Sequence, residues 1–161
     1  MAVNFGAEAL VKLIGKDIRE LDREMSALAS HMKFLKKFAA NPVAHQSAMV
    51  KMSVDTKLRA TKAANKSDKL WLAIRKATEK MPKDQRKQSR KRLETALMKT
   101  DAKIAAAAKS SEGLYKELKR IQKSKIIDTP AEGALQVTLV TLQAIITAYK
   151  GWKSMRARHL K

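Results

Sequence analysis

The chain has 161 residues, and its 35 lysines and arginines against 15 acidic residues give a formal net charge of +20. It has no cysteine, which excludes disulfides and thiolate metal sites, and only five glycines and three prolines. This composition is that of one helical domain. The charge favours anionic partners such as nucleic acid, an anionic membrane surface or an acidic protein.

The first predicted helix covers residues 7–40. Apolar residues recur there at alternating steps of four and three, as along the seam of a coiled coil. They are Ile14, Ile18, Leu21, Met25, Leu28, Met32, Leu35 and Ala39. Charged residues of both signs lie off the seam, as on a solvated helix face. The helix should end before Pro42, because the residue preceding a proline is pushed out of the helical region.

The second predicted helix covers residues 43–80. Its apolar side is expected to hold Val50, Val54, Leu58, Trp71, Ile74 and Met81. Pro82 suits the first turn of the next helix.

The third predicted helix covers residues 82–124. Its apolar seam starts at Leu93 and has small residues at its middle. Followed backwards, the same seam reaches Arg90, Arg86 and Lys83. A core cannot absorb three unpaired cations in succession. The start of this helix should therefore project beyond the core or meet an anion.

The fourth predicted helix covers residues 130–150. Thr129, Pro130 and Glu132 have the spacing of a capping box, and the run from Gly133 to Tyr149 carries no charge. A helix that is apolar on every side is either the buried centre of a bundle or a segment that contacts a membrane. Gly151 is expected to end it, leaving a basic tail at residues 151–161.

These elements predict an all-α fold, a single domain over residues 1–161. The first three helices are long and amphipathic, and they form an antiparallel bundle with the apolar fourth helix inside. One bundle covers such a helix poorly, so we expect a homo-oligomer.

The sequence contains little that indicates catalysis or metal binding. Its three histidines lie far apart and outside any metal-binding motif, and it has no nucleophile elbow and no phosphate-binding glycine loop. We therefore expect no enzyme, no catalytic residue, no metal and no cofactor. The N-terminus lacks the pattern of a signal peptide, which favours a cytoplasmic or virion-internal location.

The densest charge lies at residues 83–92, which hold six cations and one acid. We expect the cations to bind the backbone of nucleic acid, or another polyanion, without sequence preference. They are Lys83, Arg86, Lys87, Arg90, Lys91 and Arg92. The leading hypothesis is a non-enzymatic structural or assembly protein, and its composition would suit a component inside a virus particle, beside packaged genome.

Two alternatives remain. A pore-forming or genome-delivery protein would insert the fourth helix into a membrane, with Tyr149 and Trp152 at the interface and cations beside them. A helix-binding adaptor would use the apolar seams and would need no anion. The residues expected to contact a membrane or another copy are Leu135, Val140, Leu142, Ile145, Ile146, Tyr149 and Trp152.

Overall fold

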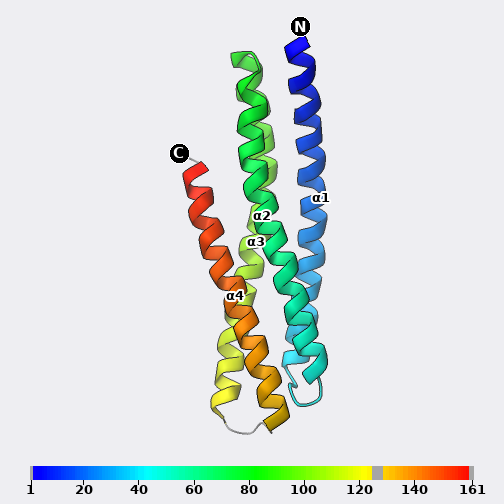
Figure 1. Cartoon of the computed structure of the whole chain (residues 1–161), viewed down its shortest axis with the longest axis vertical. Helices are drawn as coiled ribbons and strands as arrows, with labels where there is room; N and C mark the ends of the chain where they lie inside the picture. The colour runs from blue at the N-terminus through cyan, green and yellow to red at the C-terminus, as the bar shows by residue number, and fades with distance from the viewer. Residues whose placement is uncertain (1, 125–128, 160–161) are drawn as a thin grey trace.

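The computed structural model describes the backbone of residues 2–124 and 129–159, and the side chains of residues 6–124 and 131–158. Consecutive helices run in opposite directions and pack as a bundle (Figure 1). The prediction of an all-α bundle of four helices is confirmed. The described residues contain α1 Ala2–Ala39, α2 Gln46–Glu79, α3 Lys83–Lys123 and α4 Thr129–His159, and no strand.

Most helix boundaries lie near the predicted positions. Pro42 and Pro82 fall in the short connections at residues 40–45 and 80–82, where the chain reverses. The α2 helix begins at Gln46, three residues later than predicted, and α4 begins one residue earlier than predicted. The side chains of Thr129 and Pro130 in the predicted capping box lie outside the described residues.

The predicted end of the fourth helix is wrong. Helix α4 continues through Gly151 to His159, so most of the expected basic tail is helical. Glycine in a helix interior costs only about 1 kcal/mol, and the lysines and arginines that follow it are good helix formers. Trp152, one residue beyond Gly151, is buried against the other helices, and this packing favours the extra turns.

Helix α1 buries one continuous stripe of side chains. Residues three and four apart lie on the same face of a helix, so a single stripe can face the other helices along the whole length. The buried residues of the stripe are Val11, Ile14, Ile18, Leu21, Met25, Leu28, Met32, Leu35 and Ala39.

The expected apolar side of α2 is wrong in its first half. Val54 and Leu58 are exposed, and Ser53 and Thr56 are buried instead. The Ser53 hydroxyl donates to the carbonyl of Val50 at 2.8 Å, and the Thr56 hydroxyl donates to the carbonyl of Met52 at 2.7 Å. Because their own helix satisfies these hydroxyls, the small polar residues can be buried and let neighbouring helices come close.

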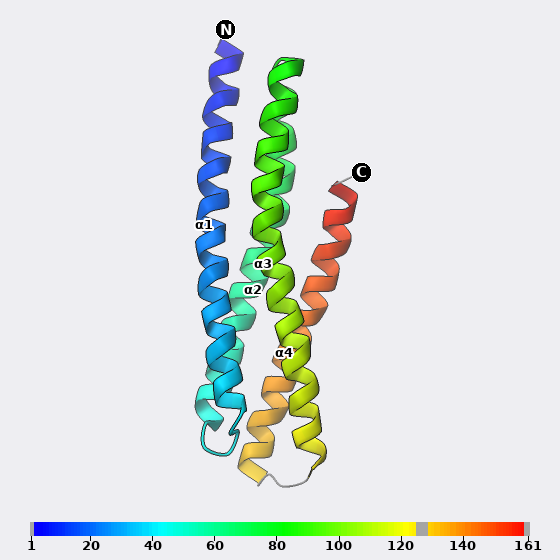
Figure 2. The ribbon, with the colours of Figure 1, turned by 180° about the vertical axis from the view of Figure 1, so that it is seen from behind.

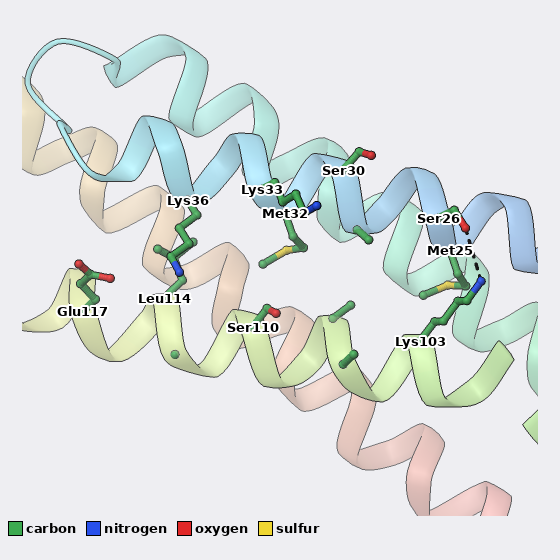
Figure 3. Close-up of a pocket in the computed structure, with 14 residues that line it drawn as sticks. Met25, Ser26, Ser30, Met32, Lys33, Lys36, Lys103, Ser110, Leu114 and Glu117 are labelled. Carbon is green, nitrogen blue, oxygen red and sulfur yellow. Dashed lines mark hydrogen bonds between the residues drawn. The ribbon is translucent and has the colours of Figure 1, made fainter. Parts of the chain in front are cut away.

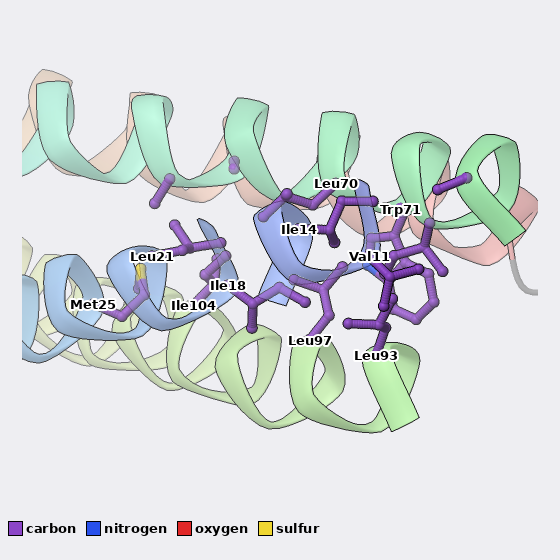
Figure 4. Packing of buried hydrophobic residues seen from close by; sticks show 14 of the residues in the cluster. Val11, Ile14, Ile18, Leu21, Met25, Leu70, Trp71, Leu93, Leu97 and Ile104 are labelled. Carbon is purple, nitrogen blue, oxygen red and sulfur yellow. The ribbon is translucent and has the colours of Figure 1, made fainter. Parts of the chain in front are cut away.

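Helices α2 and α3 occupy the middle of the bundle. Both pack against α1 and against α4, whereas no described Cα atom of α1 lies within 8 Å of one in α4. One apolar cluster joins mainly α1, α2 and α3, and Trp71 is fully buried in it (Figure 4). A second cluster at the other end brings in the first half of α4 through Leu135, Leu139 and Leu142.

Helix α4 therefore lies at one edge of the bundle, not inside it as predicted. One of its faces packs on α2 and α3, while Val137 and Val140 on the other face are 45% and 60% exposed. Its C-terminal end also stops short of the end where α2 passes into α3 (Figure 2). Of the described helices, only α1, α2 and α3 reach that end of the bundle, which carries the cationic segment at residues 83–92.

Candidate polyanion interface

The cations of the predicted segment at residues 83–92 lie on α3 and differ in their exposure to solvent. Arg86 and Arg90 are half-buried, and the other four cations of the segment are exposed. A hollow of about 700 Å³ is lined by every cation of the segment except Arg92. Two acids, Asp84 and Glu94, line this α3 hollow as well, and every lining residue belongs to α3.

Arg86 and Arg90 are bonded to the end of α2. A guanidinium nitrogen of Arg86 donates to the carbonyls of Glu79 at 3.1 Å and Met81 at 3.2 Å. Arg90 Nε donates to the hydroxyl of Thr78 at 2.9 Å. The last carbonyls of a helix lack partners within the helix and carry its partial negative charge. These two cations therefore have an anion-like partner within the chain itself.

A second hollow, of about 880 Å³, lies between α1 and α3. Both hollows are lined by five cations, but this one is lined by a single acid where the α3 hollow is lined by two. Its residues come from two helices. Within the described residues, none of its five cations is in an ion pair. These cations are Arg19, Arg23, Lys91, Arg92 and Lys99.

One carboxylate, Asp22, lines this second hollow. Its Oδ1 lies 2.8 Å from Nζ of Lys103 and accepts a hydrogen bond from the Thr100 hydroxyl at 3.4 Å. The charge of Asp22 is therefore matched by a cation that does not line the hollow. This leaves the five cations around it uncompensated.

The sequence places charges of both signs on one face of α1, and the fold turns two of the acids away from the arginines. Glu20 and Glu24 turn toward α2, where their carboxylates lie 3.9 Å and 3.4 Å from Nζ of Lys66. Arg19 and Arg23, each one residue earlier, line the hollow beside α3. Sequence reasoning missed these two arginines because the acids beside them made the face resemble an ordinary solvated surface.

Two further hollows lie on the same side of the bundle. One, of about 270 Å³, lies nearer the N-terminus of α1 and shares Gln88 and Arg92 with the central hollow. The other, of about 780 Å³, lies further along between α1 and α3, and there Lys36 reaches from α1 toward Leu114 of α3 (Figure 3). We call the three hollows together the α1/α3 furrow. Its cations are Lys12, Arg19, Arg23, Lys33, Lys36, Lys91, Arg92, Lys99 and Lys103, and its acids are Glu8, Asp22 and Glu117.

The seven α4 residues expected to contact a membrane or another copy do not share one surface. Val140 is exposed and Tyr149 is half-buried. The stretch Ala131–Arg158 is long enough to cross a membrane and contains an 18-residue window with a mean hydropathy of 1.3, of which 44% is buried. The buried members of the set are Leu135, Leu142, Ile145, Ile146 and Trp152.

A buried carboxylate lies where α2, α3 and α4 meet. Asp101 is fully buried and accepts hydrogen bonds from the Ser67 hydroxyl at 2.5 Å and from Trp71 Nε1 at 2.8 Å. Arg156 Nε of α4 lies 3.7 Å from the carboxylate. Burial raises the pKa of Asp101, while the two hydrogen bonds and Arg156 oppose that rise. The sequence pattern contains no signal for this site, because Asp101 lies beside the apolar seam predicted from Leu93 onward and not on it.

Among the described residues, no group of three or more histidine, aspartate or glutamate side chains is placed to hold a metal ion. In comparisons with known families, curated proteins and solved structures, the chain matches no family model, no curated protein and no solved structure.

Proposed function

We propose that this protein binds the sugar-phosphate backbone of nucleic acid, without sequence preference, along the α1/α3 furrow. The observation that carries the proposal is the central hollow, where two helices present five cations and the one lining carboxylate is paired elsewhere. Each cation that neutralises a phosphate releases counterions, and this release drives sequence-neutral binding.

The length of the furrow suits an extended polymer. Its lining runs from Glu8 to Lys36 along α1, which at 1.5 Å per residue is about 40 Å. One strand of nucleic acid carries a phosphate for every 3.4 Å or so of axis, so roughly a dozen phosphates span that distance. The furrow has nine cations and three acids along it, which favours a polyanion over a single small anion.

The furrow also supports backbone contact over base recognition. No phenylalanine, tyrosine or tryptophan is among its lining residues, so it offers bases no surface on which to stack. Lys91 lines both the furrow and the α3 hollow, so a bound strand could continue onto Lys83 and Lys87. In this proposal the role is structural, in packing or assembly with nucleic acid, and no catalytic step is involved.

The assembly part of the proposal includes self-association. Val50, Val54 and Ala134 line a hollow of about 560 Å³ between α2 and α4 on the outside of the bundle. Val54 is exposed there and Val50 and Ala134 are half-buried, while Gln46, Ser47 and Lys51 complete the lining. Apolar side chains left open on a surface are a common feature of contacts between copies. Sedimentation velocity would test this part, and a monomer over the full concentration range would refute it.

The test of nucleic-acid binding compares two triple variants of equal charge. Arg19→Gln, Arg23→Gln and Arg92→Gln together remove three furrow cations. The control replaces Lys62, Lys69 and Lys76 with glutamine, because these exposed lysines of α2 line none of the hollows. Affinity for duplexes of unrelated sequence is measured by fluorescence anisotropy across a range of salt concentrations.

We expect the furrow variant to bind every duplex on the order of 100-fold more weakly at 0.1 M salt. Its salt slope should be lower by about 2.7, because each lost phosphate contact removes about 0.9. The control variant should lose much less. If both variants lose the same affinity, binding follows net charge alone, and the furrow is not the interface.

A further inference from the structure

Two properties of α4, the helix at the edge of the bundle, bear on contact with a membrane. By length and composition it could cross a membrane, yet more than half of its most apolar window is not buried. Val137 and Val140 point away from the bundle and are exposed. The outward face of α4 therefore holds two large apolar side chains, next to the exposed polar residues Gln136, Gln143 and Thr147.

Among the described side chains, one polar contact joins the C-terminal half of α4 to α3. Arg156 Nε lies 3.7 Å from Asp101, whereas a well-made bond between a guanidinium and a carboxylate is about 2.7 to 2.9 Å. Both Arg156 Nε and Trp152 Nε1 are buried without a hydrogen-bond partner. The Arg156 guanidinium also lies over the Trp152 ring, 5.6 Å from its centroid. This attachment leaves hydrogen-bonding capacity unused on the α4 side.

Arg156 has a second role, because it compensates the buried charge of Asp101. The other groups that face this carboxylate are Ser67 and Trp71 of α2, and neither is charged. Without Arg156, an ionised Asp101 would keep its desolvation cost and lose its counterion. Departure of α4 would let water reach the carboxylate and relieve that cost.

The end of α4 that holds Arg156 is rich in cations. Lys150, Lys153 and Arg158 are exposed there, and the first acid back along the helix is Glu132. Phosphate headgroups of an anionic bilayer would attract all four cations. They would also offer Arg156 closer partners than Asp101 does.

We propose that α4 is a detachable helix that leaves α2 and α3 to enter an anionic bilayer, and that the contact of Arg156 with Asp101 decides how readily it leaves. The function goes beyond polyanion binding, since α4 lines no part of the α1/α3 furrow. The apolar cluster that joins mainly α1, α2 and α3 takes only Trp152 among its buried residues from α4, so most of this core does not depend on α4.

The experiment places an environment-sensitive NBD label on each face. The chain has no cysteine, so a single introduced cysteine is labelled uniquely. Val137→Cys reports from the outer face of α4, and Leu58→Cys, 56% exposed on α2, reports from the bundle. Each labelled protein is mixed with vesicles of phosphatidylcholine alone or with equal parts of phosphatidylglycerol, with a quencher attached to the lipid chains.

With anionic vesicles we expect the label at residue 137 to shift to the blue and be quenched from within the bilayer, while the label at residue 58 is not. Equal quenching at both positions would mean that the whole bundle adsorbs, and no quenching at residue 137 would mean that α4 stays bound. Either result overturns the proposal. Val140→Asp, at an exposed position that tolerates charge in the folded bundle, should abolish the signal at residue 137.

The role of the contact between Arg156 and Asp101 is tested by two variants that should change the lipid requirement in opposite directions. Arg156→Gln should reduce the lipid needed for half-maximal quenching about tenfold, because it leaves the buried carboxylate without its counterion. Asp101→Asn should increase the lipid needed for half-maximal quenching, because the buried charge itself is gone. The double variant should return toward the wild-type value. Arg158→Gln, which removes the same charge at an exposed position, should have little effect. If Arg156→Gln and Asp101→Asn both promote entry, the contact is merely structural and the inference is wrong.

Discussion

The two sides of α3 handle charge in opposite ways. Toward α2 and α4 the helix presents Arg86, Arg90 and Asp101, and each of them has a partner within the bundle. Toward α1 it presents Arg92 and Lys99 beside an open hollow, where neither is in an ion pair with a described residue, although Lys103 farther along is paired with Asp22. We call these the closed side and the open side of α3.

The difference shows that the local density of cations does not identify a binding surface. Arg90 and Arg92 are two residues apart in one cationic segment, yet Arg90 is bonded to Thr78 and Arg92 faces the furrow. Charges used inside the fold should contribute to stability, and charges left open should contribute to binding. Variants on the two sides of α3 should separate these two contributions.

The largest effect on stability is expected at Asp101. Asp101→Ala removes the acceptor of the Ser67 and Trp71 hydrogen bonds, so two buried donors lose their partner. We expect the free energy of unfolding, measured by urea denaturation, to fall by about 2 to 3 kcal/mol. Asp101→Asn keeps an acceptor oxygen and should lose less. Equal losses for the two variants would show that these hydrogen bonds do not hold the closed side together.

A smaller loss is expected where α3 caps α2. Arg90→Ala removes the bond to Thr78 and a cation from the negative end of α2, which should lower the free energy of unfolding by about 1 kcal/mol. Lys87→Ala, an exposed change in the same segment, should stay within about 0.5 kcal/mol of wild type. If Arg90→Ala leaves stability intact but weakens binding to nucleic acid as much as Arg92→Gln does, then Arg90 belongs to the open side.

The helices could be predicted from the sequence because their signals are local. Prolines at positions 42 and 82 mark two of the connections, and large apolar residues repeat at helical spacing along α1. In α2 the same logic failed. Val54 and Leu58 form an apolar stripe beside the buried one, and hydroxyls that bond within the helix take the buried positions. The spacing of apolar residues does not indicate which hydroxyls can be buried because they bond to a carbonyl of their own helix.

The site depends on contacts between distant residues, which is why much less of it could be predicted. Lys91 and Arg92 were expected to bind polyanion and do line the furrow, but the position of Arg19 beside them depends on how α1 packs against α3. Asp101 is 34 residues from Ser67 and 30 from Trp71 in the chain, and Arg156 comes from a third helix. Without these partners, nothing distinguishes this aspartate from a surface acid.

The smallest and most specific effect is a dependence on pH. Burial raises the pKa of Asp101 above its ordinary 3.8, so the folded protein holds this proton more tightly than the unfolded chain does. The contribution of Asp101 to the free energy of unfolding is therefore fully present below the unfolded pKa. It is lost as the pH rises through the folded pKa.

The other carboxylates titrate in the same range, so the measurement is the difference in free energy of unfolding between wild type and Asp101→Asn, followed by urea denaturation at a series of pH values. We expect the free energy of unfolding of wild type to rise relative to that of Asp101→Asn as the pH falls. Arg156→Gln should move that gain to higher pH, because Arg156 is the charge that lowers the pKa of Asp101. A difference that does not change with pH would mean that water reaches the carboxylate, and then the closed side of α3 would be as open as the furrow.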